Sequence, residues 1–92
     1  MLHLLKINSR YYARLVKGQK LFEIRLNDRD FQVGDMIHFG LTDDNPDYMH
    51  GKFNPHCDWR ITYIHSGLGM QEGYVSLSIV PYKKYDEYQP LG

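Results

Sequence analysis

Charged side chains that alternate along one extended segment are the residues of this chain best suited to chemistry. They lie in residues 18–29, where GQKLFEIRLNDR runs from a glycine directly into a polar loop. In a strand, side chains at i and i+2 share a face, with Cα atoms about 6.6 Å apart. We therefore predict one row made of Glu23, Arg25 and Asn27, with the apolar residues between them on the opposite face. Lys20 has the other parity, but its long stem can bend round to the row.

This row offers the donors and the acceptor of an anion or base site. Arg25 presents a planar fork suited to phosphate or to a guanine edge, and Lys20 offers a compact charge for phosphate. Glu23 can accept from the exocyclic amine of a base. The alternative is that Glu23 pairs with Arg25 or Lys20 only to satisfy charge beside the core, and the residues by themselves slightly favour it.

The polar residues that follow the row allow two interpretations. Asn27, Asp28 and Arg29 extend the row into a loop, where they could belong to the same site. Asn and Asp side chains also bond to nearby backbone amides and thereby build turns. Both interpretations stay open at this stage.

Composition limits the class of protein. The chain has 92 residues, 42% of them hydrophobic, so we expect one domain that buries roughly 65% of its unfolded surface. Eleven Lys and Arg balance eleven Asp and Glu, so any nucleic-acid binding needs a local patch. One cysteine excludes an intramolecular disulfide framework. No apolar run approaches the roughly 20 residues of a membrane span and no signal peptide is visible, so we expect a cytoplasmic protein.

The first third of the chain reads as a strand and a helix. Residues 3–7 are predicted to form the strand, and Asn8 with Ser9 offers an N-cap for a helix over 10–17. Gly18 supplies the left-handed position that ends this helix.

The predicted helix has two distinct faces. Its apolar face consists of Tyr11, Tyr12, Leu15 and Val16. Its other face is a basic stripe of Arg10, Arg14 and Lys17. A solvated helix surface explains this stripe more simply than phosphate contacts do.

Four further strands are predicted from period-two alternation and turn residues, at 20–26, 36–39, 59–65 and 74–80. The alternation predicts that Trp59, Ile61 and Tyr63 share one face, and that Val75, Leu77 and Ile79 are buried while Ser76 and Ser78 face away. Pro81 should close the last strand, and residues 41–56, rich in Asp, Asn and Pro, should form a long surface loop. This order predicts an α+β, mainly β fold: a small, mostly antiparallel barrel of about five strands, with one helix after the first strand.

Several separated blocks resemble the ASCH family of the PUA-like superfamily, most closely its short bacterial and phage members with no assigned function. These blocks are HLLKI at 3–7, the helix, the GxKxxExR signature at 18–25, NDRDFQVGD at 27–35 and EGYV at 72–75. They agree in order and spacing over residues 3–80, except the loop 42–57. The resemblance implies an ASCH domain over 1–81, followed by a C-terminal tail over 82–92.

The same resemblance implies a PUA-like barrel with a cleft between the first helix and the sheet that holds RNA or a nucleotide. Lys20, Glu23 and Arg25 would line this cleft, His3 lies beside it, and Tyr74 could stack on a base. We expect a monomer with no cofactor and no membrane partner.

An enzyme is the second reading. Some small ASCH-like proteins are amidohydrolases that act on acetylated cytidine with a Lys, Thr and Glu trio. Here Lys20 is kept, Glu23 stands where the threonine aligns, and Glu72 is a weak candidate for the glutamate. The lysine would need a pKa lowered by burial, whereas a neighbouring carboxylate raises it.

Two other clusters complete the candidates. His50, His56, Cys57 and Asp58 have metal-ligand chemistry, but their spacing suits zinc poorly, and we expect no bound metal. Tyrosines near the end of the chain would make an exposed aromatic surface in a protein-interaction module, the third reading; they are Tyr82, Tyr85 and Tyr88.

Overall fold

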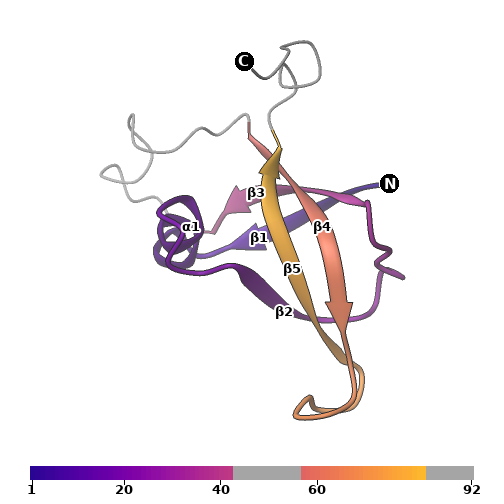
Figure 1. Cartoon of the computed structure of the whole chain (residues 1–92). Helices are drawn as coiled ribbons and strands as arrows, with labels where there is room; N and C mark the ends of the chain where they lie inside the picture. Colours follow the sequence, from indigo (N-terminus) through magenta and orange to yellow (C-terminus); the bar gives the residue numbers. More distant parts are fainter. Residues whose placement is uncertain (43–56, 83–92) are drawn as a thin grey trace, which may run out of the picture.

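The structure of this chain is a computed structural model that describes residues 1–42 and 57–82. Its elements are β1 (Leu2–Ile7), α1 (Ser9–Val16), β2 (Phe22–Leu26), β3 (Met36–Leu41), β4 (Asp58–His65) and β5 (Tyr74–Tyr82) (Figure 1). The predicted order of one strand, one helix and four strands is confirmed. Within the described part, no helix has the length and apolarity that a membrane crossing requires.

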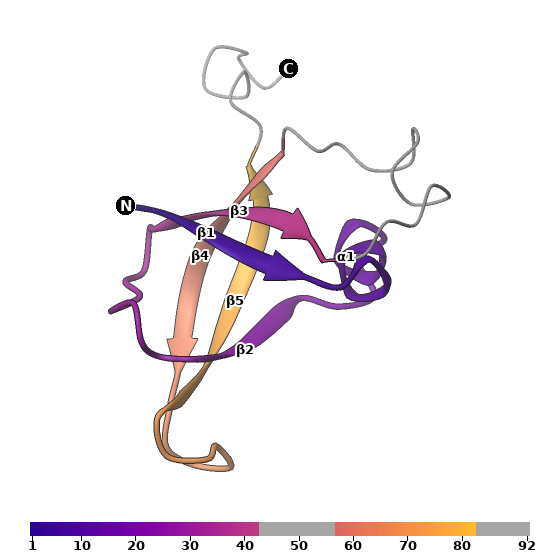
Figure 2. The same ribbon diagram turned by 180° about the vertical axis from the view of Figure 1, so that it is seen from behind.

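The strands form one curled sheet in the order β1-β3-β4-β5-β2. β1 runs parallel to β3, and the other neighbours are antiparallel. The sheet curls into a half-barrel, and α1 lies at the end where β1 finishes and β2 begins (Figures 1 and 2). β1 and β2 are therefore the two edges of the sheet, and their facing sides are not joined by a ladder.

The ends of α1 follow the predicted capping chemistry. The Asn8 side chain accepts from the backbone N–H of Arg10 at 2.9 Å, and Gly18 follows the last turn with a φ of 75°. The apolar face is corrected in part, because Tyr11 is 50% exposed and Val16 39% exposed. The helix instead buries positions three and four apart, which are Ser9, Tyr12, Ala13 and Leu15.

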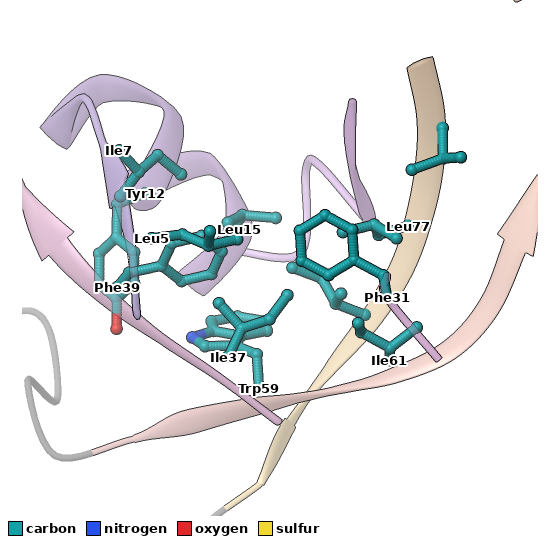
Figure 3. Packing of buried hydrophobic residues seen from close by; sticks show 12 residues of the cluster. Leu5, Ile7, Tyr12, Leu15, Phe31, Ile37, Phe39, Trp59, Ile61 and Leu77 are labelled. Carbon is teal, nitrogen blue, oxygen red and sulfur yellow. The ribbon is translucent and has the colours of Figure 1, made fainter. Parts of the chain in front are cut away.

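The core fills the concave side of the half-barrel. Figure 3 shows Tyr12 from α1 close to Phe39 and Trp59, with ring centroids 5.9 and 6.2 Å from the Tyr12 ring. β5 confirms the predicted alternation, because Val75, Leu77 and Ile79 are each no more than 4% exposed. The cluster as a whole consists of Leu5, Ile7, Tyr12, Leu15, Phe31, Ile37, Phe39, Trp59, Ile61, Val75, Leu77 and Ile79.

β4 departs from simple alternation halfway along. Trp59 and Ile61 are buried as predicted, but Tyr63 is 61% exposed and Ile64 packs against the core. The pairing with β5 shifts between Ile61 and Tyr63. Such a bulge inserts one residue and reverses which side chains point inward after it.

β5 also continues through Pro81, where the sequence predicted its end. Pro81 pairs with Trp59 on the β4 side, whereas the pairing with β2 stops at Ser78. A proline lacks the N–H that a strand paired on both sides would need, and here only one side is paired.

Candidate ligand-binding site

β2 turns its charged face toward the core of the half-barrel. Its register places Glu23 opposite Leu77 and Arg25 opposite Val75, two residues of the buried face of β5. Glu23 is only 5% exposed, whereas the apolar side chains on the outer face of β2 are 44 to 52% exposed. The predicted row of Glu23 and Arg25 is therefore present, and it points inward.

The buried carboxylate of Glu23 is held by two cations. Lys20 Nζ donates to Glu23 Oε1. Arg25 donates to Glu23 Oε2 from both Nε, at 3.2 Å, and Nη2, at 3.0 Å. A carboxylate removed from water is costly unless it is paired and hydrogen-bonded, and both Glu23 oxygens meet that condition. We call these three residues the Lys20–Glu23–Arg25 cluster.

Lys20 also joins the cluster to the helix. Its Nζ lies 4.7 Å from the ring centroid of Tyr11 on α1 and 5.9 Å from that of Phe22 on β2. A cation above an aromatic face is attracted by the ring quadrupole. The contact with Glu23 shows that the stem of Lys20 bends toward the row, as predicted. The Lys20 ammonium group also lies beside two half-exposed rings, Tyr11 and Phe22.

Two arginines span the gap between the sheet edges, which we call the β1–β2 seam. Arg25 Nη2 donates to the carbonyl of Lys6 at 2.8 Å, and Arg29 Nη1 donates to that of Leu4 at 2.9 Å. The carbonyl of Ile7, at odd parity, accepts instead from Thr42, the residue that follows β3. The even-numbered carbonyls of β1 thus face the seam, and side-chain donors satisfy those of Leu4 and Lys6.

The loop after β2 serves mainly as a turn. Asn27 Oδ1 accepts from the backbone N–H of Phe31 at 3.3 Å, and the Asn27 N–H donates to the carbonyl of Gly73 at 2.8 Å. Asp28 is exposed, and its Oδ1 lies 4.0 Å from Arg29 Nε. Of these loop residues, Arg29 reaches the β1–β2 seam, while Asn27 supports the turn.

His3 and Tyr74 do not join the Lys20–Glu23–Arg25 cluster. His3 is buried, and its Nε2 lies 2.8 Å from Asp35 Oδ2. An ionised carboxylate only accepts, so Nε2 carries the hydrogen. Tyr74 pairs with Leu26 and has the parity of the outer face of the sheet.

Asp35 is a buried acid that the sequence analysis did not single out. The hydrogen bond from His3 lowers the pKa of Asp35, as do the bonds from the Gln32 N–H and the Met1 amino group, although burial opposes them. In the sequence, Asp35 follows Gly34 and reads as part of a turn. Its partner lies 32 residues away, and only the pairing of β1 with β3 brings the two together.

The proposed metal ligands have other partners where the structure describes them. Cys57 is buried, and its Sγ donates to the carbonyl of Asp58 at 3.2 Å. Asp58 Oδ1 lies 2.9 Å from His38 Nδ1, a contact that the sequence analysis missed. His50 and His56 lie outside the described residues. Within residues 1–42 and 57–82, no group of three or more His, Cys, Asp and Glu could hold a metal ion.

The residues proposed for an amidohydrolase are separated in the structure, and those proposed for a protein-interaction surface are only partly described. Glu72 and Lys20 lie at opposite ends of β2. Glu72 is next to Gly73, which bonds to Asn27 just after the end of β2, whereas Lys20 lies just before the start of β2. Of the tail tyrosines, Tyr82 contacts Arg60: the guanidinium carbon of Arg60 lies 4.4 Å from the centroid of the Tyr82 ring. Tyr85 and Tyr88 fall outside the described residues.

Comparison with known proteins gives the family. No curated protein is similar enough to this chain to count as a match. A family model described as a domain of unknown function, DUF3850, matches residues 2–79. Since that match spans most of the 92 residues, the chain belongs to the DUF3850 family.

Proposed function

We propose that this protein is an ASCH-like member of the PUA-like superfamily, akin to its short bacterial and phage proteins, and that it binds RNA or a nucleotide. The binding group is the Lys20–Glu23–Arg25 cluster. The resemblance of the sequence blocks and the five-stranded half-barrel with one helix after β1 support this proposal. The observation that carries it is a charged row on the inner face of an edge strand, where apolar side chains would stabilise the core at lower cost.

The cluster keeps donors available for an anion. Arg25 uses Nε and Nη2 on Glu23 and on the Lys6 carbonyl, so its Nη1 has no partner among the described residues. Lys20 has three N–H groups and uses one of them on Glu23. Charge-assisted bonds from guanidinium and ammonium groups to phosphate are the strong class of hydrogen bond. Glu23, with both oxygens engaged, mainly orients the two cations toward such a ligand.

The test is an NMR titration that follows amide shifts with short RNAs, mononucleotides and modified nucleosides. Lys20→Ala and Arg25→Ala should each weaken binding, and the dependence on salt should become shallower as phosphate contacts are lost. Glu23→Gln should weaken binding and alter the preference among bases. Arg60→Ala removes a cation from β4 instead and serves as the matched control.

Two outcomes contradict the proposal separately. Wild-type binding by folded Lys20→Ala and Arg25→Ala variants refutes the site. A wild-type protein that shows no shift with any of these ligands refutes the function.

The amidohydrolase reading is the second candidate, because Lys20 contacts Glu23 in a half-buried position. Attack on an amide requires a free amine lone pair, whereas in this structure Lys20 Nζ donates to Glu23 Oε1. Incubation with acetylated cytidine decides between the readings: release of acetate, abolished by Lys20→Ala, would establish the enzyme.

A further inference from the structure

We propose that the ligand is a single-stranded nucleic acid several nucleotides long, and that its backbone runs from the Lys20–Glu23–Arg25 cluster onto the exposed face of α1. This inference rests on the proposed function, because it extends the same site. It adds a second contact surface, the α1 stripe, made of Arg10, Arg14 and Lys17.

Positive charge is concentrated at one end of the sequence. Residues 1–29 hold seven Lys and Arg but two acidic residues, a formal charge of +5 in a chain whose net charge is zero. The seven are Lys6, Arg10, Arg14, Lys17, Lys20, Arg25 and Arg29. Only one further Lys or Arg, Arg60, is among the described residues. The excess of positive charge that a polyanion would require is therefore confined to the part of the chain that holds β1, α1 and β2.

The α1 stripe is exposed and unneutralised. Its three side chains are spaced by four and three residues, so they lie on one side of the helix and span about 10 Å along it. No described acidic residue forms an ion pair with any of them. This arrangement is unfavourable for the helix itself, because Arg10 and Arg14 repel at i and i+4 and Arg10 lies near the positive helix end. Arg10 and Arg14 as a pair therefore do not stabilise the helix.

The stripe and the cluster form one surface. The backbone N–H of Lys20 donates to the carbonyl of Arg14 at 3.1 Å, and Lys20 Nζ lies over the ring of Tyr11. Cationic groups thus continue from β2 through Lys20 to α1. A mononucleotide carries its phosphate at one position, whereas a strand with several phosphates can contact the cluster and the stripe together.

Two exposed aromatic rings beside Lys20 favour an unpaired strand. Tyr11 is 50% exposed and Phe22 is 44% exposed, and they flank Lys20. Bases of single strands stack on such rings beside cationic groups, whereas the faces of bases inside a duplex are covered by their neighbours.

The experiment compares an eight-nucleotide single-stranded RNA with a mononucleotide, using fluorescence anisotropy for the first and amide shifts for the second. The test protein carries Arg10→Gln, Arg14→Gln and Lys17→Gln together, since glutamine preserves helix propensity. Arg60→Gln is the matched control, and circular dichroism checks that each variant is folded.

We expect the triple variant to bind the octamer at least about tenfold more weakly than wild type. The magnitude of the slope of log association constant against log salt concentration should decrease by about 2, because each of three lost phosphate contacts contributes about 0.7. Binding of the mononucleotide should stay at the wild-type level, and Arg60→Gln should match wild type throughout.

The outcomes separate this inference from the proposed function. Octamer binding by the triple variant with wild-type affinity and salt slope overturns the inference, as does equally strong binding of the matching duplex. Octamer binding that depends on the α1 stripe but not on Lys20 or Arg25 refutes the cluster as the site and, with it, a strand that runs from the cluster onto α1. A wild-type protein that binds neither ligand refutes both.

Discussion

Arg25 donates to the main-chain carbonyl of Lys6 across the open edge of the half-barrel, while the same guanidinium holds the carboxylate of Glu23. One planar group thus connects β1, β2 and a buried charge. The fork geometry of arginine allows this, because its N–H groups point in fixed, different directions. Where a closed barrel would have a ladder of backbone bonds, this molecule has the side chains of Arg25 and Arg29.

Arg25→Lys should therefore weaken the β1–β2 seam although it keeps the charge. A lysine ammonium cannot engage Glu23 and Lys6 in the same geometry, so we expect the free energy of unfolding to fall by about 1 kcal/mol. Amide hydrogen exchange in β1 should accelerate. Exchange at the wild-type rate in β1 would show that the seam does not depend on this guanidinium.

Glu23→Gln should destabilise the protein more than an exposed ion pair would suggest. It leaves Lys20 and Arg25, whose side chains are 22% and 23% exposed, without their counter-charge. We expect a loss of about 2 kcal/mol in urea denaturation, below the 3 to 5 kcal/mol of a fully buried pair. Asp28→Asn, at a side chain that is 60% exposed, is the control and should change stability by less than about 0.5 kcal/mol. Equal effects of the two substitutions would contradict the role of burial.

The lowered pKa of Asp35 predicts how the stability of the protein changes with acid pH. Its pKa in the folded protein is lowered, chiefly by the hydrogen bond from His3, so its bonds contribute stability at pH above the unfolded value of 3.8. That contribution is lost as the pH falls below this value and through the folded pKa. Asp35→Asn should reduce stability near pH 6 by about 1 to 2 kcal/mol and flatten the fall toward pH 3. Urea denaturation at both pH values measures this, and parallel pH profiles for the variant and wild type would refute it.

Leu77→Ala tests the core on β5. Leu77 is fully buried, and its truncation should reduce the free energy of unfolding by about 2 to 5 kcal/mol. Val80→Ala, on the same strand but 45% exposed, should cost less than about 1 kcal/mol. If denaturant midpoints of the two variants coincide, the packing around Leu77 differs from that described.

The alternation of apolar and polar residues predicted β5 correctly, because apolar and polar side chains alternate regularly from Val75 to Ile79. The same rule predicted that Glu23 and Arg25 share a face, but it could not say that this face points inward, because inward charge requires partners from other segments. For Tyr63 the rule failed, since nothing in the surrounding sequence marks the bulge between Ile61 and Tyr63.

Contacts between distant segments were beyond the reach of local pattern. The pairing of His3 with Asp35 and the bonds of Arg25 and Arg29 to β1 join residues 19 to 32 positions apart. They depend on the curl of the sheet, which is a property of the whole fold. The residue types that could bind an anion and the pairing of Glu23 with Lys20 or Arg25 were predictable, but the β1 carbonyls that Arg25 and Arg29 also engage were not.

The inward charges of β2 also bear on how this molecule avoids aggregation. The odd-numbered residues Leu21 and Asn27 bond to Ile79 of β5 and to Gly73 just before β5, so the main-chain groups of Phe22 and Ile24 face the free edge beside exposed apolar side chains. Such an edge invites pairing with a strand of another molecule. Charges that must stay paired on the inner face oppose this, because an added strand would have to bury or displace them. Replacing Glu23 and Arg25 with leucine would leave an uninterrupted apolar strand, the kind of segment that assembles into intermolecular sheets.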